Sequence, residues 1–224
     1  AVRILDPVPD AENHAETYQF AGRYYLRRGD QLARAEALRY YRRALQLLQR
    51  GDSIVRVTNR LERERALARG RPDLAGPPTG FASMYRLLSV AHRRLNENAQ
   101  ALKYALYTQE LAPATAETYE QLASAYLGVD QPDQAAIVLL EGALITGDDA
   151  LGVALSDLYR AGLDKDGCAF TQGLNPACPI VHRHVCEASA RAMAFWARRG
   201  YPDKAASVRQ LALARFTCDG ATLD

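Results

Sequence analysis

Residues 85–135 read YRLLSVAHRRLNENAQALKYALYTQELAPATAETYEQLASAYLGVDQPDQA, and they contain one pattern of side chains twice. The first copy consists of Tyr85, Leu88, Ser89, His92 and Ala101. The second copy lies 34 residues further on and consists of Tyr119, Leu122, Ala123, Tyr126 and Ala135. Residues three or four positions apart share one face of a helix, so each copy predicts two helices joined by a short turn. The period predicts a chain built from successive helix pairs.

This pattern resembles the tetratricopeptide repeat, in which aromatic-x2-Leu-Gly-x2-Tyr is followed by Ala-x3-Phe and Pro in a 34-residue unit. Less complete copies occur at residues 18–44, 152–159 and 192–205. One hairpin cannot bury both of its apolar faces, so adjacent copies stack. The resemblance therefore implies an all-α fold of antiparallel helix-hairpin repeats, stacked in a right-handed superhelix.

Helical periodicity extends over almost the whole chain. It predicts helices at about 11–29, 32–50, 53–69, 80–95, 97–111, 115–128, 131–146, 149–162, 180–199 and 202–217. Segments rich in proline and glycine interrupt this rhythm at 71–80 and 164–179. We expect an extended N-terminal arm at 1–10, a hairpin plus an extra helix at 11–70, and a linker at 71–80. Core repeats follow at 81–162, and a disulfide-stapled loop with a C-terminal hairpin completes the chain at 163–224.

Charge and hydropathy exclude some classes of function. The net charge of +2 gives no global attraction to nucleic acid, and no apolar run approaches the roughly 18 residues of a membrane-inserted helix. The charge is unevenly distributed, because residues 1–80 hold 15 arginines against 10 acidic residues, whereas residues 131–180 hold two basic and seven acidic residues. Such asymmetry can order a contact with a partner.

The four cysteines, Cys168, Cys178, Cys186 and Cys218, all lie in the last 57 residues of the chain. Their irregular spacing, without a CxxC pair, does not suit zinc. Cys186 and Cys218 lie at similar distances on either side of the turn at 200–203, so antiparallel helices place them opposite each other. We predict this pair and, by elimination, Cys168 with Cys178, among three possible connectivities.

Disulfides persist in oxidising compartments. The chain also begins Ala1-Val2-Arg3, as after removal of a signal peptide, although a chain cut there for another reason would begin in the same way. We expect a periplasmic or extracellular location.

The sequence gives little sign of chemistry. It has no GxSxG motif and no phosphate-binding glycine loop, so we expect no enzyme and no cofactor. His92 occupies a repeat position and should pack between helices. His182 and His184 point to different faces of a helix, so we expect a surface location with at most incidental metal affinity.

In tetratricopeptide proteins the first helix of each hairpin lines a binding groove. The resemblance assigns to that groove Gln19, Arg23, Arg27, Arg86, Val90, Arg93, Arg94, Glu120, Ser124 and Leu127, followed by Asp157 and Arg160. The asparagine-rich clamp of chaperone-binding members is missing, but arginines suit an acidic protein or peptide. An ordinary solvated surface would carry the same residues.

The sequence therefore favours a non-enzymatic scaffold outside the cytoplasm that binds a protein or peptide partner. The alternative is a structural subunit that self-assembles into a filament or ring, or that belongs to a larger extracellular or membrane-attached complex. An accessory domain cut from a longer enzyme is a third possibility.

Overall fold

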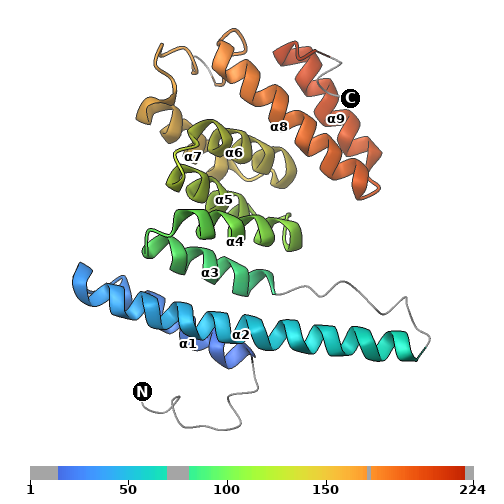
Figure 1. The fold of residues 1–224 in the computed structure, drawn as a ribbon. Helices are drawn as coiled ribbons and strands as arrows, with labels where there is room; N and C mark the ends of the chain where they lie inside the picture. Colours follow the sequence, from blue (N-terminus) through green and yellow to red (C-terminus); the bar gives the residue numbers. More distant parts are fainter. Residues whose placement is uncertain (1–14, 70–80, 171–172, 220–224) are drawn as a thin grey trace. The chain divides into compact units, whose positions relative to one another are not determined.

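The computed structural model describes residues 15–69, 81–170 and 173–219 (Figure 1). These residues are almost entirely helical, and their only β feature is an isolated bridge between Phe170 and Leu174. The helices in chain order are α1 (Ala15–Gly29), α2 (Arg34–Ala68), α3 (Ala82–Arg94), α4 (Asn98–Leu111), α5 (Ala116–Gly128), α6 (Pro132–Thr146), α7 (Asp149–Leu158), the π-helical η4 (Tyr159–Leu163), α8 (Pro179–Arg198) and α9 (Pro202–Phe216). The predicted all-α class is confirmed.

The chain folds as two compact units, Ala1–Leu111 (unit 1) and Ala112–Asp224 (unit 2). Their boundary falls inside the segment 81–162 that the sequence predicted as one core, because α3 and α4 belong to unit 1 and α5 and α6 to unit 2. The predicted arm at 1–10 and linker at 71–80 lie outside the described residues.

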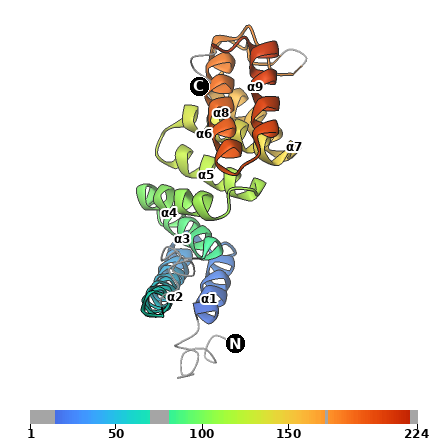
Figure 2. The ribbon, with the colours of Figure 1, turned by 90° about the vertical axis from the view of Figure 1, so that its right-hand side faces the viewer.

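Unit 1 consists of two consecutive helix hairpins, α1–α2 and α3–α4 (Figures 1 and 2). Helix α3 packs on α2 and also contacts α1. The core between the hairpins contains Leu48 of α2 with Met84 and Leu88 of α3, each without exposed surface. Burying three such side chains stabilises the contact by several kcal/mol, at about 1.5–3 kcal/mol each.

Helix α2 corrects one prediction, since 34–68 is a single helix rather than two helices broken near residue 51. Gly51 lies inside this helix and faces unit 1's core. A Cβ at this position would lie 2.8 Å from Met84 Cε and 3.0 Å from Tyr18 Cβ. The glycine therefore permits a close approach between helices, and it does not mark a turn.

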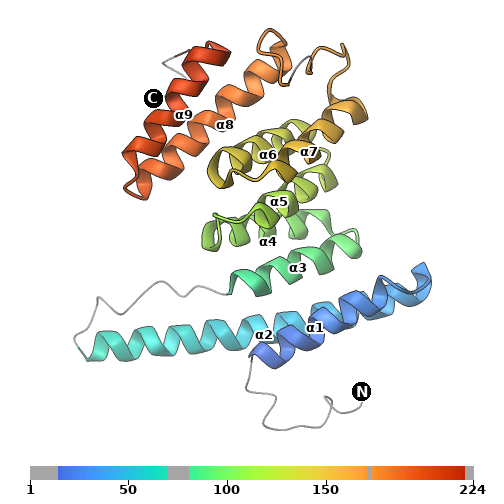
Figure 3. The same cartoon turned by 180° about the vertical axis from the view of Figure 1, so that it is seen from behind.

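Unit 2 begins with the same arrangement of helices. Helices α5 and α6 form a hairpin, and α7 packs on α6 and contacts α5, just as α3 packs on α2 and contacts α1. Helix α8 also packs on α6, and α9 packs on α8 (Figure 3). Successive hairpins thus bury their faces against their neighbours within each unit.

The second hairpin of unit 2, which α7 begins, is incomplete. Helix α7 continues into η4, where Gly162 has a φ of 130°, and the chain then enters the cysteine loop. The Asp164 carboxylate accepts hydrogen bonds from the backbone N–H groups of Cys168 and Ala169, with N···O distances of 3.0 and 2.8 Å. A loop stapled by Cys168–Cys178 therefore stands where a second helix is otherwise expected.

Candidate binding face

The predicted groove positions of unit 1 lie on α1 and α3, which contact each other. Arg23 and Arg27 are exposed on α1, while Gln19 of α1 and Val90 of α3 are half-buried. Each helix turns its apolar stripe inward, and on α1 that stripe is formed by Tyr18, Ala21, Gly22 and Leu26. The predicted positions are therefore those left on the outward and flanking faces.

Two half-buried arginines of α3 have lowered pKa values. Burial lowers the pKa of Arg86, and the nearby guanidinium of Arg23 on α1 lowers it further. Burial and then Arg94 lower the pKa of Arg93, and Asp30 partly offsets this. Like charge therefore acts on partly desolvated guanidinium groups of α3.

Arg94 has a structural partner. Its Nε donates to Asp30 Oδ1 at 2.9 Å, and the hydroxyl of Tyr41 donates to the same oxygen at 2.9 Å. Arg94 therefore ties α3 to the turn between α1 and α2. A ligand at Arg94 would have to compete with Asp30 for the guanidinium group.

Two exposed aromatic residues of α1 were missed by the sequence reasoning. The side chains of Phe20 and Tyr24 are 67% and 39% exposed, and they lie four residues apart beside Arg23 and Arg27. We call these four residues the α1 face. The signal was present in the spacing, because positions 20, 24 and 27 fall opposite the buried stripe of α1. Exposed rings beside guanidinium groups are typical of recognition surfaces.

The remaining predicted positions belong to unit 2. Glu120 and Leu127 are exposed on α5, and Ser124 is half-buried. Asp157 of α7 and Arg160 of η4 are exposed. Helices α5 and α7 contact each other, so this unit has its own first-helix face, of mixed charge.

His92 is packed between helices as predicted. Its Nδ1 lies 2.6 Å from Glu97 Oε2, and its ring stacks on Tyr104 with the centroids 5.3 Å apart. Only 5% of the residue is exposed. A structural role accounts for these contacts.

His184 corrects the expected surface location, because it has no exposed surface. Its Nδ1 lies 2.8 Å from the hydroxyl of Tyr159, and its Nε2 lies 2.8 Å from Asp133 Oδ1, which also accepts from Arg183. Burial lowers the pKa of His184, against the opposing effect of Asp133. A neutral ring that donates from Nε2 to Asp133 and accepts at Nδ1 from Tyr159 satisfies all three groups.

The Tyr–His–Asp hydrogen bonds resemble those of a catalytic relay, but the tyrosine and histidine rings are not accessible from solvent. Tyr159 is also without exposed surface, so no substrate reaches either ring. The three residues come from η4, α8 and α6, and their hydrogen bonds hold these elements together.

Glu141 of α6 is a second buried ionisable group in unit 2. Only 7% of the residue is exposed. Burial raises its pKa to about 7, although Arg191 and Arg198 of α8 act in the opposite direction. The Glu141 carboxyl group is therefore protonated in part of the molecules at neutral pH.

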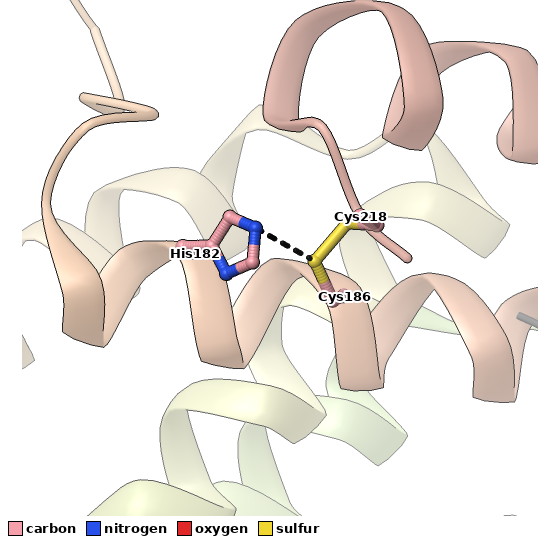
Figure 4. A group of neighbouring side chains, drawn as sticks. All are labelled: His182, Cys186 and Cys218. Atoms are coloured by element: carbon pink, nitrogen blue, oxygen red, sulfur yellow. Dashed lines mark hydrogen bonds between the residues drawn. A yellow bond between two sulfur atoms is a disulfide. The ribbon is translucent and has the colours of Figure 1, made fainter. Parts of the chain in front are cut away.

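Both predicted disulfides are present, Cys186–Cys218 and Cys168–Cys178, and the structure has no free cysteine. His182 is half-buried on α8, one turn before Cys186 (Figure 4). Its Nε2 lies 3.8 Å from the Cys186 sulfur.

No family model and no curated protein matches this chain. The tetratricopeptide assignment therefore stays a prediction from the repeat pattern. Within the described residues, none of the helices combines the length and apolar character needed to cross a membrane.

Proposed function

We propose that this chain is a non-enzymatic scaffold of the tetratricopeptide type, with hairpins in a right-handed superhelix, which binds an acidic segment of a partner protein. The binding surface is the α1 face together with Arg86 and Arg93 of α3. The observation that carries the proposal is the exposure of two arginines and two aromatic rings on the outward side of α1, a helix that contacts α3. The charge of Arg23 also reaches Arg86 of α3, whose pKa is lowered by burial and then by Arg23.

An acidic segment suits this surface for two reasons. Its carboxylates can accept paired hydrogen bonds from guanidinium groups, and they relieve the repulsion between Arg23 and Arg86. The exposed rings of Phe20 and Tyr24 offer apolar contact area at low entropic cost. We expect a bound segment that alternates acidic and apolar residues.

The proposed location is the periplasm or the cell exterior. Two disulfides near the C-terminal end of the chain support an oxidising environment, because thiols in the cytosol are kept reduced.

Titration of a labelled peptide of alternating glutamate and leucine, followed by fluorescence anisotropy, tests the binding surface. The double charge reversal Arg23→Glu with Arg86→Glu should weaken binding at least about tenfold. The matched control is Arg34→Glu with Arg39→Glu on α2, which makes the same change in net charge at two exposed positions of the same unit. If both pairs of substitutions weaken binding equally, the effect comes from net charge alone, which would contradict the proposal.

Self-assembly is a second candidate, and the outer face of α9 favours it. Leu213 is 40% exposed there, in an open hollow lined also by Ala206, Arg209, Gln210 and Ala214. Leu211, 42% exposed, lies on a different side of the helix. Helix α7 of the same unit exposes Val153 between Asp149 and Asp157, which complements the basic and aromatic α1 face of another copy.

Light scattering on the oxidised protein, at low and high salt, separates the two candidates. Growth into large species that salt reverses supports assembly through complementary charge. A monomer at every concentration rules out assembly and leaves the adaptor function.

A further inference from the structure

Three side chains with metal-binding atoms meet where α8 and the end of α9 lie side by side (Figure 4). His182 and Cys186 are four residues apart on α8, so they share one face of that helix. Thr217 ends α9 in a left-handed conformation, and the chain turns back so that the Cys218 N–H reaches the Ala212 carbonyl at 3.3 Å. One ligand atom from each of His182, Cys186 and Cys218 lies within 4.8 Å of the others.

One distance between ligand atoms already suits a tetrahedral metal site. Zinc binds thiolate at about 2.3 Å and imidazole at about 2.0–2.1 Å, so neighbouring ligand atoms are about 3.5–3.8 Å apart. The distance from His182 Nε2 to Cys186 Sγ is 3.8 Å. The two sulfurs must separate to bind one metal ion, and breaking the bond between them allows this.

We propose that the reduced form of this cluster is a binding site for Zn²⁺ or another thiophilic cation, and that the Cys186–Cys218 disulfide is the closed state of the site. A thiol or phosphine reductant supplies two electrons, and the disulfide takes up two protons to give two thiols. Binding of Zn²⁺ then releases both thiol protons. Cys186 and Cys218 bind as thiolates, the neutral imidazole of His182 is the third ligand, and the fourth position takes water or a donor from outside the protein.

Burial supports a site with one open side. The residues Cys186 and Cys218 are 5% and 3% exposed, whereas His182 is half-buried. Hydrophobic surroundings strengthen the metal–thiolate bonds, and the imidazole lies on the side from which solvent or a further ligand arrives. The metal would also replace the disulfide as the link between α8 and the end of α9.

The second cysteine pair serves as an internal comparison. Asp164 lies near Cys168 and Cys178, but its two carboxylate oxygens already accept the N–H groups of Cys168 and Ala169. We assign no metal to that cluster.

Cobalt titration of the full chain, reduced with a phosphine and then freed of it without oxygen, tests the proposal. Reduced protein should bind one Co²⁺ and develop thiolate-to-cobalt absorption, which Zn²⁺ displaces. His182→Ala should weaken binding at least about tenfold, because one ligand of three is lost. Cys186→Ser with Cys218→Ser should abolish the absorption, while Cys168→Ser with Cys178→Ser should retain it.

Folding is followed separately, by the thermal unfolding of each reduced protein with and without Zn²⁺. Zinc should raise the Tm of the reduced chain but not that of Cys186→Ser with Cys218→Ser. The proposal is overturned if the reduced chain gives no thiolate absorption, if His182→Ala binds cobalt as tightly as the unaltered chain, or if binding depends on Cys168 and Cys178. The site lies in unit 2, so none of these outcomes depends on the proposed binding face of unit 1.

Discussion

Glu141 makes the stability of unit 2 depend on pH. Its pKa is raised to about 7 in the folded chain, above its usual value of 4.5. Proton uptake by the folded state therefore stabilises it fully below about pH 4.5, and this contribution is lost as the pH rises through 7. Glu141→Gln should remove the dependence and raise the free energy of unfolding at pH 8 by about 2–3 kcal/mol.

Urea denaturation of both proteins at pH 5 and pH 8 measures this effect. The difference in the free energy of unfolding between the unaltered chain and Glu141→Gln should be small at pH 5 and large at pH 8. A Glu141→Gln variant that is less stable at pH 8 would show that ion pairing with Arg191 and Arg198 outweighs desolvation.

Tyr159→Phe tests the buried hydrogen bonds of His184. The substitution keeps the ring and removes the hydroxyl, so Nδ1 of His184 loses its donor at a position without exposed surface. We expect a loss of about 1–3 kcal/mol in the free energy of unfolding. Tyr201→Phe is the control, because this tyrosine is 52% exposed and keeps its ring contacts. Equal midpoints in urea for the two variants would contradict a structural role for the Tyr159 hydroxyl.

The two histidines show what single residues reveal in a sequence. His92 was placed correctly because its repeat position fixes the helix face on which it lies. His184 was not, because its partners Tyr159 and Asp133 are 25 and 51 residues away and no local pattern points to them. The Arg94–Asp30 pair was missed for the same reason.

At the scale of helices, substituting two glycines of unit 2 distinguishes the effect of packing from that of helix propensity. A Cβ on Gly142 of α6 would lie 2.4 Å from Cγ of the buried Tyr119, whereas a Cβ on Gly152 of α7 would have nothing within 4 Å. Gly142→Ala should destabilise by about 1–3 kcal/mol, because the ring cannot move away. Gly152→Ala should stabilise by about 0.5–1 kcal/mol through helix propensity alone. Shifts of the same sign in urea midpoint would contradict this account.

Helix existence was predictable, whereas the role of a glycine was not. Periodicity located the helices, and every predicted end within the described residues lies within about two residues of the observed one, apart from the false break in α2 and the early end of α7. Gly51 and Gly200 look alike in sequence. Gly200, with a φ of 76°, ends a helix, while Gly51 is packed against Met84 and Tyr18. Only contacts between helices distinguish the two uses.

At the scale of the whole molecule, the disulfides stabilise one unit only. Both Cys168–Cys178 and Cys186–Cys218 lie in unit 2, and unit 1 contains no cysteine. A disulfide contributes about 2–4 kcal/mol, mainly by restricting the unfolded chain. Reduction in the presence of a chelator should therefore lower the stability of unit 2 and leave that of unit 1 unchanged.

Amide hydrogen exchange, with and without a phosphine reductant, resolves the two units. Exchange in α8 and α9 should accelerate most, because Cys186–Cys218 joins these helices directly, and exchange in α1–α4 should keep its rate. Adding Zn²⁺ in place of the chelator should slow α8 and α9 again if the metal takes over the link. Equal acceleration of exchange in α1–α4 would contradict this prediction and would mean that the two units unfold together. In a repeat protein, destabilising one hairpin affects only those hairpins that unfold cooperatively with it.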